Sequence, residues 1–142
     1  MEITKEQLLS FTPQFLNDFE DVDGVLREFT ENKYGGITTD AFNPDEIVIL
    51  YADYTYENYS GDAYVFGYNK VKECFFEVHG GHCSCYGLER QWVEDELTIQ
   101  ETIDIKSKWL DAPFDEERYY YSRSACKSED LYKWWKYNLN SL

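Results

Sequence analysis

The chain has 142 residues with 28 acidic and 13 basic side chains, so its formal net charge at pH 7 is −15. This length suits one domain with a buried core, and an apolar content of 43% argues against a disordered chain. A charge of this sign and size repels nucleic acid and attracts basic surfaces, so we expect no direct nucleic-acid partner.

The sequence also bears on location. It holds no apolar stretch long enough to cross a bilayer, and its first residues lack the basic start and apolar core of a signal peptide. We therefore expect a cytoplasmic protein with no membrane partner. In that compartment the cysteines are expected to be thiols or metal ligands rather than disulfides. They are Cys74, Cys83, Cys85 and Cys126.

The first part of the chain, residues 1–36, predicts helices. Thr4 and Gln7 have the spacing of a capping box, and Pro13 suits a break followed by a second helix that runs to about Asn32. The second helix would bury a stripe of apolar residues at steps of four and three. These are Phe15, Phe19, Val22, Leu26 and Phe29.

The middle part, residues 45–92, predicts an antiparallel meander because short apolar runs alternate with turn residues. Four strands are expected, over residues 46–56, 63–68, 71–78 and 82–86. Turns are expected at 60–62, 69–70 and 80–81. Strict alternation in the first strand would place one set of side chains on a single face, namely Val48, Leu50, Ala52, Tyr54 and Tyr56.

The last part, residues 97–142, predicts helices again. Residues 97–110 have weak helical spacing, whereas Ser128, followed by two acidic residues, is typical of a helix start. The inward side of that last helix would carry Leu131, Trp134, Trp135 and Leu139. We therefore predict a single α+β domain over 1–142, with an antiparallel meander of about four strands packed against N-terminal helices and a C-terminal helix.

One stretch differs from ordinary core sequence. The Cys-rich motif, GGHCSCYGLERQW over residues 80–92, combines three glycines, a histidine and two cysteines. The pattern G-x-H-C-S-C-Y-G-L-E-x-Q-W resembles one carried by small uncharacterised proteins of bacteriophages and prophages, over roughly residues 61–104. Those proteins often have Gly between the Glu and the Gln and a Pro soon after the Trp, where this chain has Arg90 and Val93-Glu94. The resemblance implies a phage-type accessory protein of the host cytoplasm and implies no reaction.

The first interpretation of the motif is a metal site. His82, Cys83 and Cys85 offer one imidazole and two thiolates, which is the ligand set that Zn²⁺ prefers. His79 or Cys74 could supply a fourth ligand. The C-x-C spacing is tighter than the C-x₂₋₄-C of structural zinc sites, so zinc is a secondary expectation and no cofactor is the primary one.

The second interpretation is nucleophilic catalysis, with Cys83 or Cys85 as the thiolate and His79 or His82 as the base. A catalytic thiolate needs a nearby positive charge, and the surrounding sequence is acidic or neutral. A non-enzymatic protein is therefore favoured.

The third interpretation is structural, and we adopt it as the default. Cysteine packs well in strands, and the glycines permit close approach of the backbone. Gln91 and Glu89 would bond the backbone, and Trp92 would anchor the edge of the sheet.

An acidic patch follows the motif, because residues 94–104 carry five acids and no base. It would either mimic nucleic-acid charge toward a basic groove or form a solvated helix start, where acids favour the helix dipole. The patch consists of Glu94, Asp95, Glu96, Glu101 and Asp104.

The tail from residue 118 to 137 interleaves basic and aromatic residues. Such a pattern can stack bases and hold phosphates, or it can cover the protein's own sheet. The candidate binding residues of this tail are Arg118, Tyr120, Arg123 and Trp134.

These observations favour an acidic phage-type accessory protein that binds and inhibits a host or defence protein through a basic surface of that partner. A small-ligand or nucleotide-binding module that sequesters its ligand is one alternative, and a zinc-binding or thiol-dependent enzyme centred on residues 79–92 is another. A homodimer is compatible with the high aromatic content.

Overall fold

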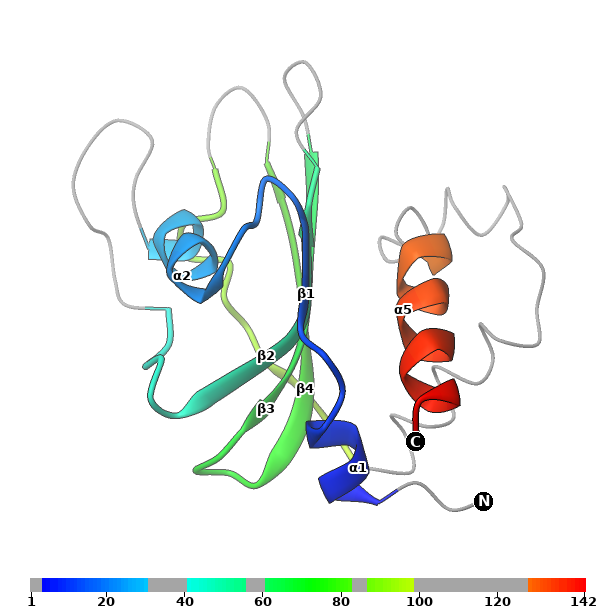
Figure 1. Cartoon of the computed structure of the whole chain (residues 1–142). Helices are drawn as coiled ribbons and strands as arrows, with labels where there is room; N and C mark the ends of the chain where they lie inside the picture. The colour runs from blue at the N-terminus through cyan, green and yellow to red at the C-terminus, as the bar shows by residue number, and fades with distance from the viewer. Residues whose placement is uncertain (1–3, 31–40, 56–60, 83–86, 99–127) are drawn as a thin grey trace.

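The computed structural model describes residues 4–30, 41–55, 61–82, 87–98 and 128–142 (Figure 1). In this part of the chain three helices and five strands form an α+β fold, as predicted. In chain order they are α1 (Lys5–Leu9), β1 (Gln14–Asn17), α2 (Val22–Thr30), β2 (Ile47–Tyr54), β3 (Gly61–Asn69), β4 (Cys74–His82), β5 (Asp95–Leu97) and α5 (Ser128–Asn140).

The described strands form one mixed sheet in the order β1-β2-β3-β4-β5. Strands β2 to β5 are an antiparallel meander, and β1 adds a parallel strand beside β2. Helix α2 covers one face of the sheet, whereas α1 and α5 lie on the other face (Figure 1). Both faces of the sheet are therefore buried by helices. None of the described helices has the length and apolar composition that a bilayer crossing needs.

The α2 side of the sheet is closed by a cluster of apolar side chains from α2, β2, β3, β4 and the segments that flank them. The α5 side is closed by a second cluster in which Phe11 contacts both Trp134 and Trp135 edge-on, with ring centroids 5.5 Å and 5.3 Å apart. The inward placement predicted for Trp134 and Trp135 is confirmed, since each is at most 3% exposed.

The N-terminal prediction was right for α1 and wrong for residues 14–17. The Thr4 hydroxyl accepts from the Gln7 amide at 3.2 Å and the Gln7 side chain accepts from the Thr4 amide at 2.9 Å, which confirms the capping box. Residues 14–17 are strand rather than helix, because they pair in parallel with residues 51–54 of β2. Helix α2 begins only at Val22, where the Asp21 carboxylate accepts from the Gly24 amide at 2.7 Å and caps it.

The predicted face of β2 was also wrong in part. A register shift between Ile49 and Tyr51 inserts one extra residue, and such a bulge reverses the alternation of side chains. Val48 and Leu50 therefore contact the α5-side cluster, whereas Ala52 and Tyr54 contact the α2-side cluster. Tyr56 lies outside the described residues.

The β3–β4 connection is longer than predicted. The Asn69 side-chain oxygen accepts from the amides of Val71 and Lys72 at 3.0 Å each, and β4 starts at Cys74. Strand β4 then continues through residues 80 and 81, so the turn predicted there is wrong. The backbone at Gly80 is pressed against the side chain of Leu88, since a Cβ at this position would lie 3.1 Å from Leu88 Cδ2.

Candidate functional site

The described end of the Cys-rich motif is tied to strand β4 by the amide of Gln91. Its oxygen accepts from the Gly81 amide at 2.8 Å, and its nitrogen donates to the Gly81 carbonyl at 2.7 Å and to the Gly87 carbonyl at 2.6 Å. Glu89 accepts from the Gly87 amide at 3.0 Å. The predicted bonding of Gln91 and Glu89 to the backbone is therefore confirmed.

Trp92, which the structural interpretation placed as an anchor at the edge of the sheet, packs against the α2-side cluster. Its ring lies against Phe42, Phe29 and Phe76, with centroid distances of 4.5, 5.1 and 5.7 Å. Its indole nitrogen donates to Glu94 at 3.0 Å. The ring is thus half-buried against the α2-side cluster while its polar atom has a charged partner.

The metal interpretation loses one of its candidate ligands. Cys74 and His82 lie at opposite ends of β4, and eight residues at about 3.3 Å each place them roughly 26 Å apart, so they cannot share an ion. Burial, followed by the Glu96 carboxylate, raises the pKa of the Cys74 thiol, which disfavours the thiolate. The described residues contain no group of three metal-ligating side chains. Cys83, Cys85 and the side chain of His82 lie outside the described residues.

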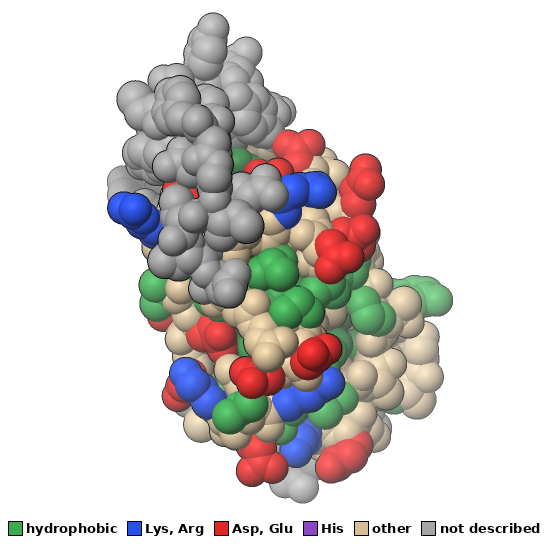
Figure 2. Space-filling view, turned by 90° about the vertical axis from the view of Figure 1, so that its left-hand side faces the viewer, with side chains coloured by type: hydrophobic (Ala, Val, Ile, Leu, Met, Phe, Trp, Pro, Cys, Tyr) green, Lys and Arg blue, Asp and Glu red, His purple; other side chains and the backbone are tan. Residues whose placement is uncertain are grey.

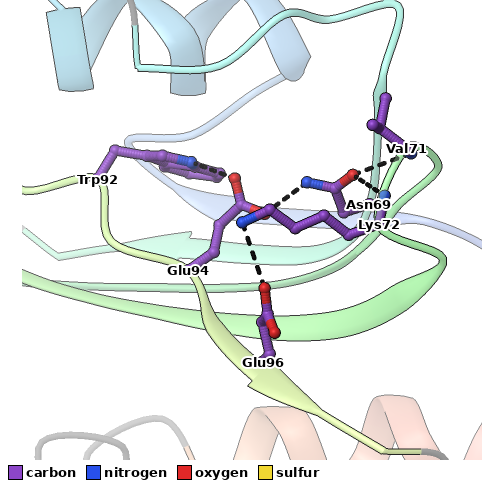
Figure 3. A network of polar contacts seen from close by, with 6 residues as sticks. All are labelled: Asn69, Val71, Lys72, Trp92, Glu94 and Glu96. Atoms are coloured by element: carbon purple, nitrogen blue, oxygen red, sulfur yellow. Dashed lines mark hydrogen bonds and ion pairs between the residues drawn. The ribbon is translucent and has the colours of Figure 1, made fainter.

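The described part of the acidic patch is not a helix start, because residues 95–97 form β5 (Figure 3). Glu94 is held by two donors, the Asn69 side-chain amide at 2.9 Å and the Trp92 indole at 3.0 Å. Glu96 pairs with Lys72 at 3.2 Å on the surface, and this carboxylate raises the pKa of the Lys72 ammonium. Glu94 is therefore part of the internal bonding of the sheet edge, whereas Asp95 and Glu96 are exposed. The patch residues Glu101 and Asp104 lie outside the described residues.

Of the candidate tail residues, the structure describes only Trp134. It is 3% exposed, its ring lies 5.5 Å from that of Tyr51, and its indole nitrogen donates to the Thr12 carbonyl at 2.7 Å. These contacts place its ring in the core rather than at the surface. Arg118, Tyr120 and Arg123 lie outside the described residues.

Sequence reasoning missed a row of polar residues that crosses the sheet on its α5 side. Asp53 is directly opposite Tyr64, and Tyr64 is directly opposite His79, so all three side chains share one face. The Tyr64 hydroxyl donates to Glu77 at 2.6 Å, and the other oxygen of Glu77 lies 3.7 Å from His79 Nε2. The available signal was that polar side chains interrupt apolar strands at corresponding positions.

The buried tyrosine of this row predicts alkaline sensitivity. Burial, and then Glu77, raise the pKa of Tyr64 well above its ordinary value. A raised pKa means that the folded state holds the proton more tightly, so this stabilisation is complete below about pH 10 and is lost as the pH rises further. Tyr64→Phe should cost about 2 kcal/mol at neutral pH through the lost bond to a carboxylate. The variant should also lose less stability than the wild type between pH 10 and 11.5.

The measurement is urea unfolding at a series of pH values. Tyr137→Phe is the matched control because Tyr137 is 67% exposed, and its curve should follow that of the wild type. Equal slopes for all three proteins above pH 10 would contradict the assignment.

The exposed charge of the described surface is predominantly acidic. Acidic side chains are spread across the face that carries α2, with fewer basic side chains between them (Figure 2). The exposed acids are Glu6, Asp18, Glu20, Asp21, Asp23, Asp45, Glu46, Glu73, Asp95, Glu96 and Asp130. The exposed bases are Arg27, Lys70, Lys72, Arg90, Lys133 and Lys136.

Four of these acids lie close together in residues 18–23, between β1 and the first turn of α2. We call Asp18, Glu20, Asp21 and Asp23 the α2 acidic cluster. Within the described part of the chain, no ion pair joins any of them to a basic side chain. Comparison with protein-family models, with curated proteins and with solved structures finds no match to this chain.

Proposed function

We propose that this protein binds a basic surface of a partner protein and blocks it, with the α2 acidic cluster as the principal contact. The observation that best supports this proposal is that four exposed carboxylates lie within six residues without an ion-pair partner in the described structure. Unpaired surface charge of one sign steers an oppositely charged partner and raises the rate of association. The net charge of −15 extends this field over the molecule.

The cluster differs from the acidic patch that the sequence singled out. Glu94 of that patch is held by Asn69 and Trp92, so a partner would have to break internal bonds to use it. Among the contacts between described residues, Asp21 is the one carboxylate of the α2 acidic cluster with an internal role, as the cap of α2. The other three carboxylates reach solvent and are available to a basic surface.

The partner class follows from the resemblance of residues 61–104 to phage and prophage proteins. A small acidic phage protein fits an inhibitor that occupies a basic, often nucleic-acid-binding, surface of a host or defence protein in the host cytoplasm. Such an inhibitor needs no cofactor and no direct nucleic-acid contact. The nucleotide-binding and thiol or zinc alternatives depend on tail and motif residues outside the described part of the chain.

A triple variant tests the proposal. Asp18→Asn, Glu20→Gln and Asp23→Asn together remove three charges while leaving the Asp21 cap intact. Partner capture from nuclease-treated host lysate should fall about tenfold or more, because close charge pairs at an interface contribute about 1.5 kcal/mol or more each. Quantitative mass spectrometry of the captured proteins, washed at low and high salt, gives the readout.

The control variant removes three negative charges elsewhere on the surface, through Glu6→Gln, Asp45→Asn and Asp130→Asn. It should retain capture at low salt. A partner that stays bound at high salt, or whose capture both triple variants lose equally, would show that the α2 acidic cluster is not the contact.

A further inference from the structure

A cavity of about 390 Å³ opens at the end of the sheet where α1, the β3–β4 turn and β5 come together. This volume lies within the range of small-ligand sites, about 300–1,000 Å³. The cavity is lined by Lys5, Tyr68, Glu73, Cys74, Phe75, Glu96, Leu97 and Thr98. None of these residues belongs to the α2 acidic cluster or to the Cys-rich motif.

The aromatic wall of the cavity already holds a cation. The Lys5 ammonium lies 5.2 Å from the centroid of the Tyr68 ring, within the range of a cation–π contact. Tyr68 and Phe75 lie ring to ring with centroids 5.0 Å apart and are almost fully buried. Phe75 therefore holds the Tyr68 ring in place, and the side of that ring that attracts positive charge is covered by the chain's own lysine.

The charged groups of the cavity also favour a cation. Glu73 and Glu96 contribute two carboxylates against the single ammonium of Lys5. The thiol of Cys74 adds no charge, because burial and Glu96 raise its pKa. Glu96 shares its charge with Lys72 on the outer surface, whereas Glu73 is exposed and forms no ion pair within the described residues.

We propose that this cavity binds the guanidinium group of an arginine side chain that a partner protein presents. The guanidinium plane would stack on the Tyr68 ring in place of the Lys5 ammonium, with its N–H groups donating to Glu73. A planar group with a fork of donors uses an aromatic wall and a carboxylate together better than a compact ammonium does. The proposal rests on the proposed function only for the source of the arginine, since the cavity's preference for guanidinium stands on its own lining.

The test uses N-acetyl-arginine methylamide as the probe and its uncharged citrulline analogue as the comparison. Backbone amide shifts in two-dimensional NMR should move at Glu73, Cys74 and Thr98 with the arginine probe, and the citrulline analogue should bind about tenfold more weakly. Absence of shifts at these residues, or equal binding of both probes, would overturn the proposal.

Single variants test the direction in which probe binding changes. Lys5→Gln should strengthen probe binding about threefold by removing the competing ammonium, and Glu73→Gln should weaken it about tenfold. Lys70→Gln and Asp130→Asn make the same charge changes outside the cavity and should leave binding unchanged. Weaker probe binding by Lys5→Gln would overturn the assignment of Lys5 as a competitor of the guanidinium, and shifts of the same amides by inorganic phosphate would show an anion site instead.

The outcome is separable from that of the proposed function. The α2 triple variant should bind the probe as the wild type does, because none of its three substitutions lines the cavity. Loss of partner capture with intact probe binding would isolate the α2 acidic cluster, and the converse would isolate the cavity.

Discussion

Replacement of Gly67 by alanine is expected to lower the free energy of unfolding by about 3 kcal/mol, at the upper end of what overpacking usually costs. Gly67 lies in the middle of β3, where an added Cβ would stand 2.5 Å from the Val48 carbonyl oxygen and 2.9 Å from the ring of Phe76. The first contact is to backbone, so it cannot be relieved by a side-chain rotation. The second would displace a fully buried ring from the α2-side cluster.

The matched control is Gly81→Ala in the neighbouring strand. Beyond its two chain neighbours, the nearest atoms of the described residues would lie 3.6 Å from a Cβ there, which is an ordinary van der Waals contact. Urea unfolding should therefore show a loss below about 1 kcal/mol for this variant. Equal losses for the two variants would mean that the close approach at Gly67 relaxes without cost.

The sequence correctly predicted those elements that depend on interactions between residues close together in the chain. The capping box of Thr4 and Gln7 and the inward tryptophans of α5 depend on spacings of three or four residues. The meander of β2 to β4 was also predictable, because its short apolar runs are separated by turn residues. The Asn69 turn differed only in length, because its side chain bonds two amides and extends the loop.

Long-range pairing explains the errors. Phe15 fits a helical stripe with Phe19, yet residues 14–17 gain more by pairing with β2, which lies more than thirty residues later in the chain. The bulge in β2 is similarly invisible to alternation, because it depends on how β3 pairs beside it. Neither partner is identifiable from the local sequence, so periodicity alone assigned both segments incorrectly.

In the candidate site too, some contacts could be predicted from residue type and others depend on long-range pairing. The hydrogen bonds of Gln91 and Glu89 to the backbone could be predicted from residue type. The hydrogen bond from Asn69 to Glu94 could not, because it joins two segments that only the fold brings together. Arg90 adopts a φ of 67°, a conformation that glycine accepts without strain.

Replacement of Gln91 by leucine is expected to lower the free energy of unfolding by about 3 kcal/mol, since three hydrogen bonds are lost and two of the freed groups belong to one backbone residue of β4. The Gln91 amide pairs with both the N–H and the C=O of Gly81, as a residue of an adjacent strand would. Leucine would leave this edge unpaired, and unpaired edges associate with other strands. The variant should therefore sediment with a larger dimer fraction than the wild type.

Gln91→Glu separates the hydrogen bonds from the loss of shape. Glutamate keeps an acceptor for the Gly81 amide but turns a carboxylate toward two carbonyl oxygens, those of Gly81 and Gly87. That environment raises the pKa of the new carboxyl in the folded state. Its penalty is therefore complete at pH values above that raised pKa, shrinks as the pH falls through it, and is gone below about pH 4.3, the ordinary glutamate value. Unfolding measured at pH 7 and pH 4 against the wild type should show the deficit narrowing, because a protonated carboxyl can donate one of the two lost bonds. A deficit that stays constant with pH would mean that packing of the Gln91 side chain, rather than its donors, holds the motif against β4.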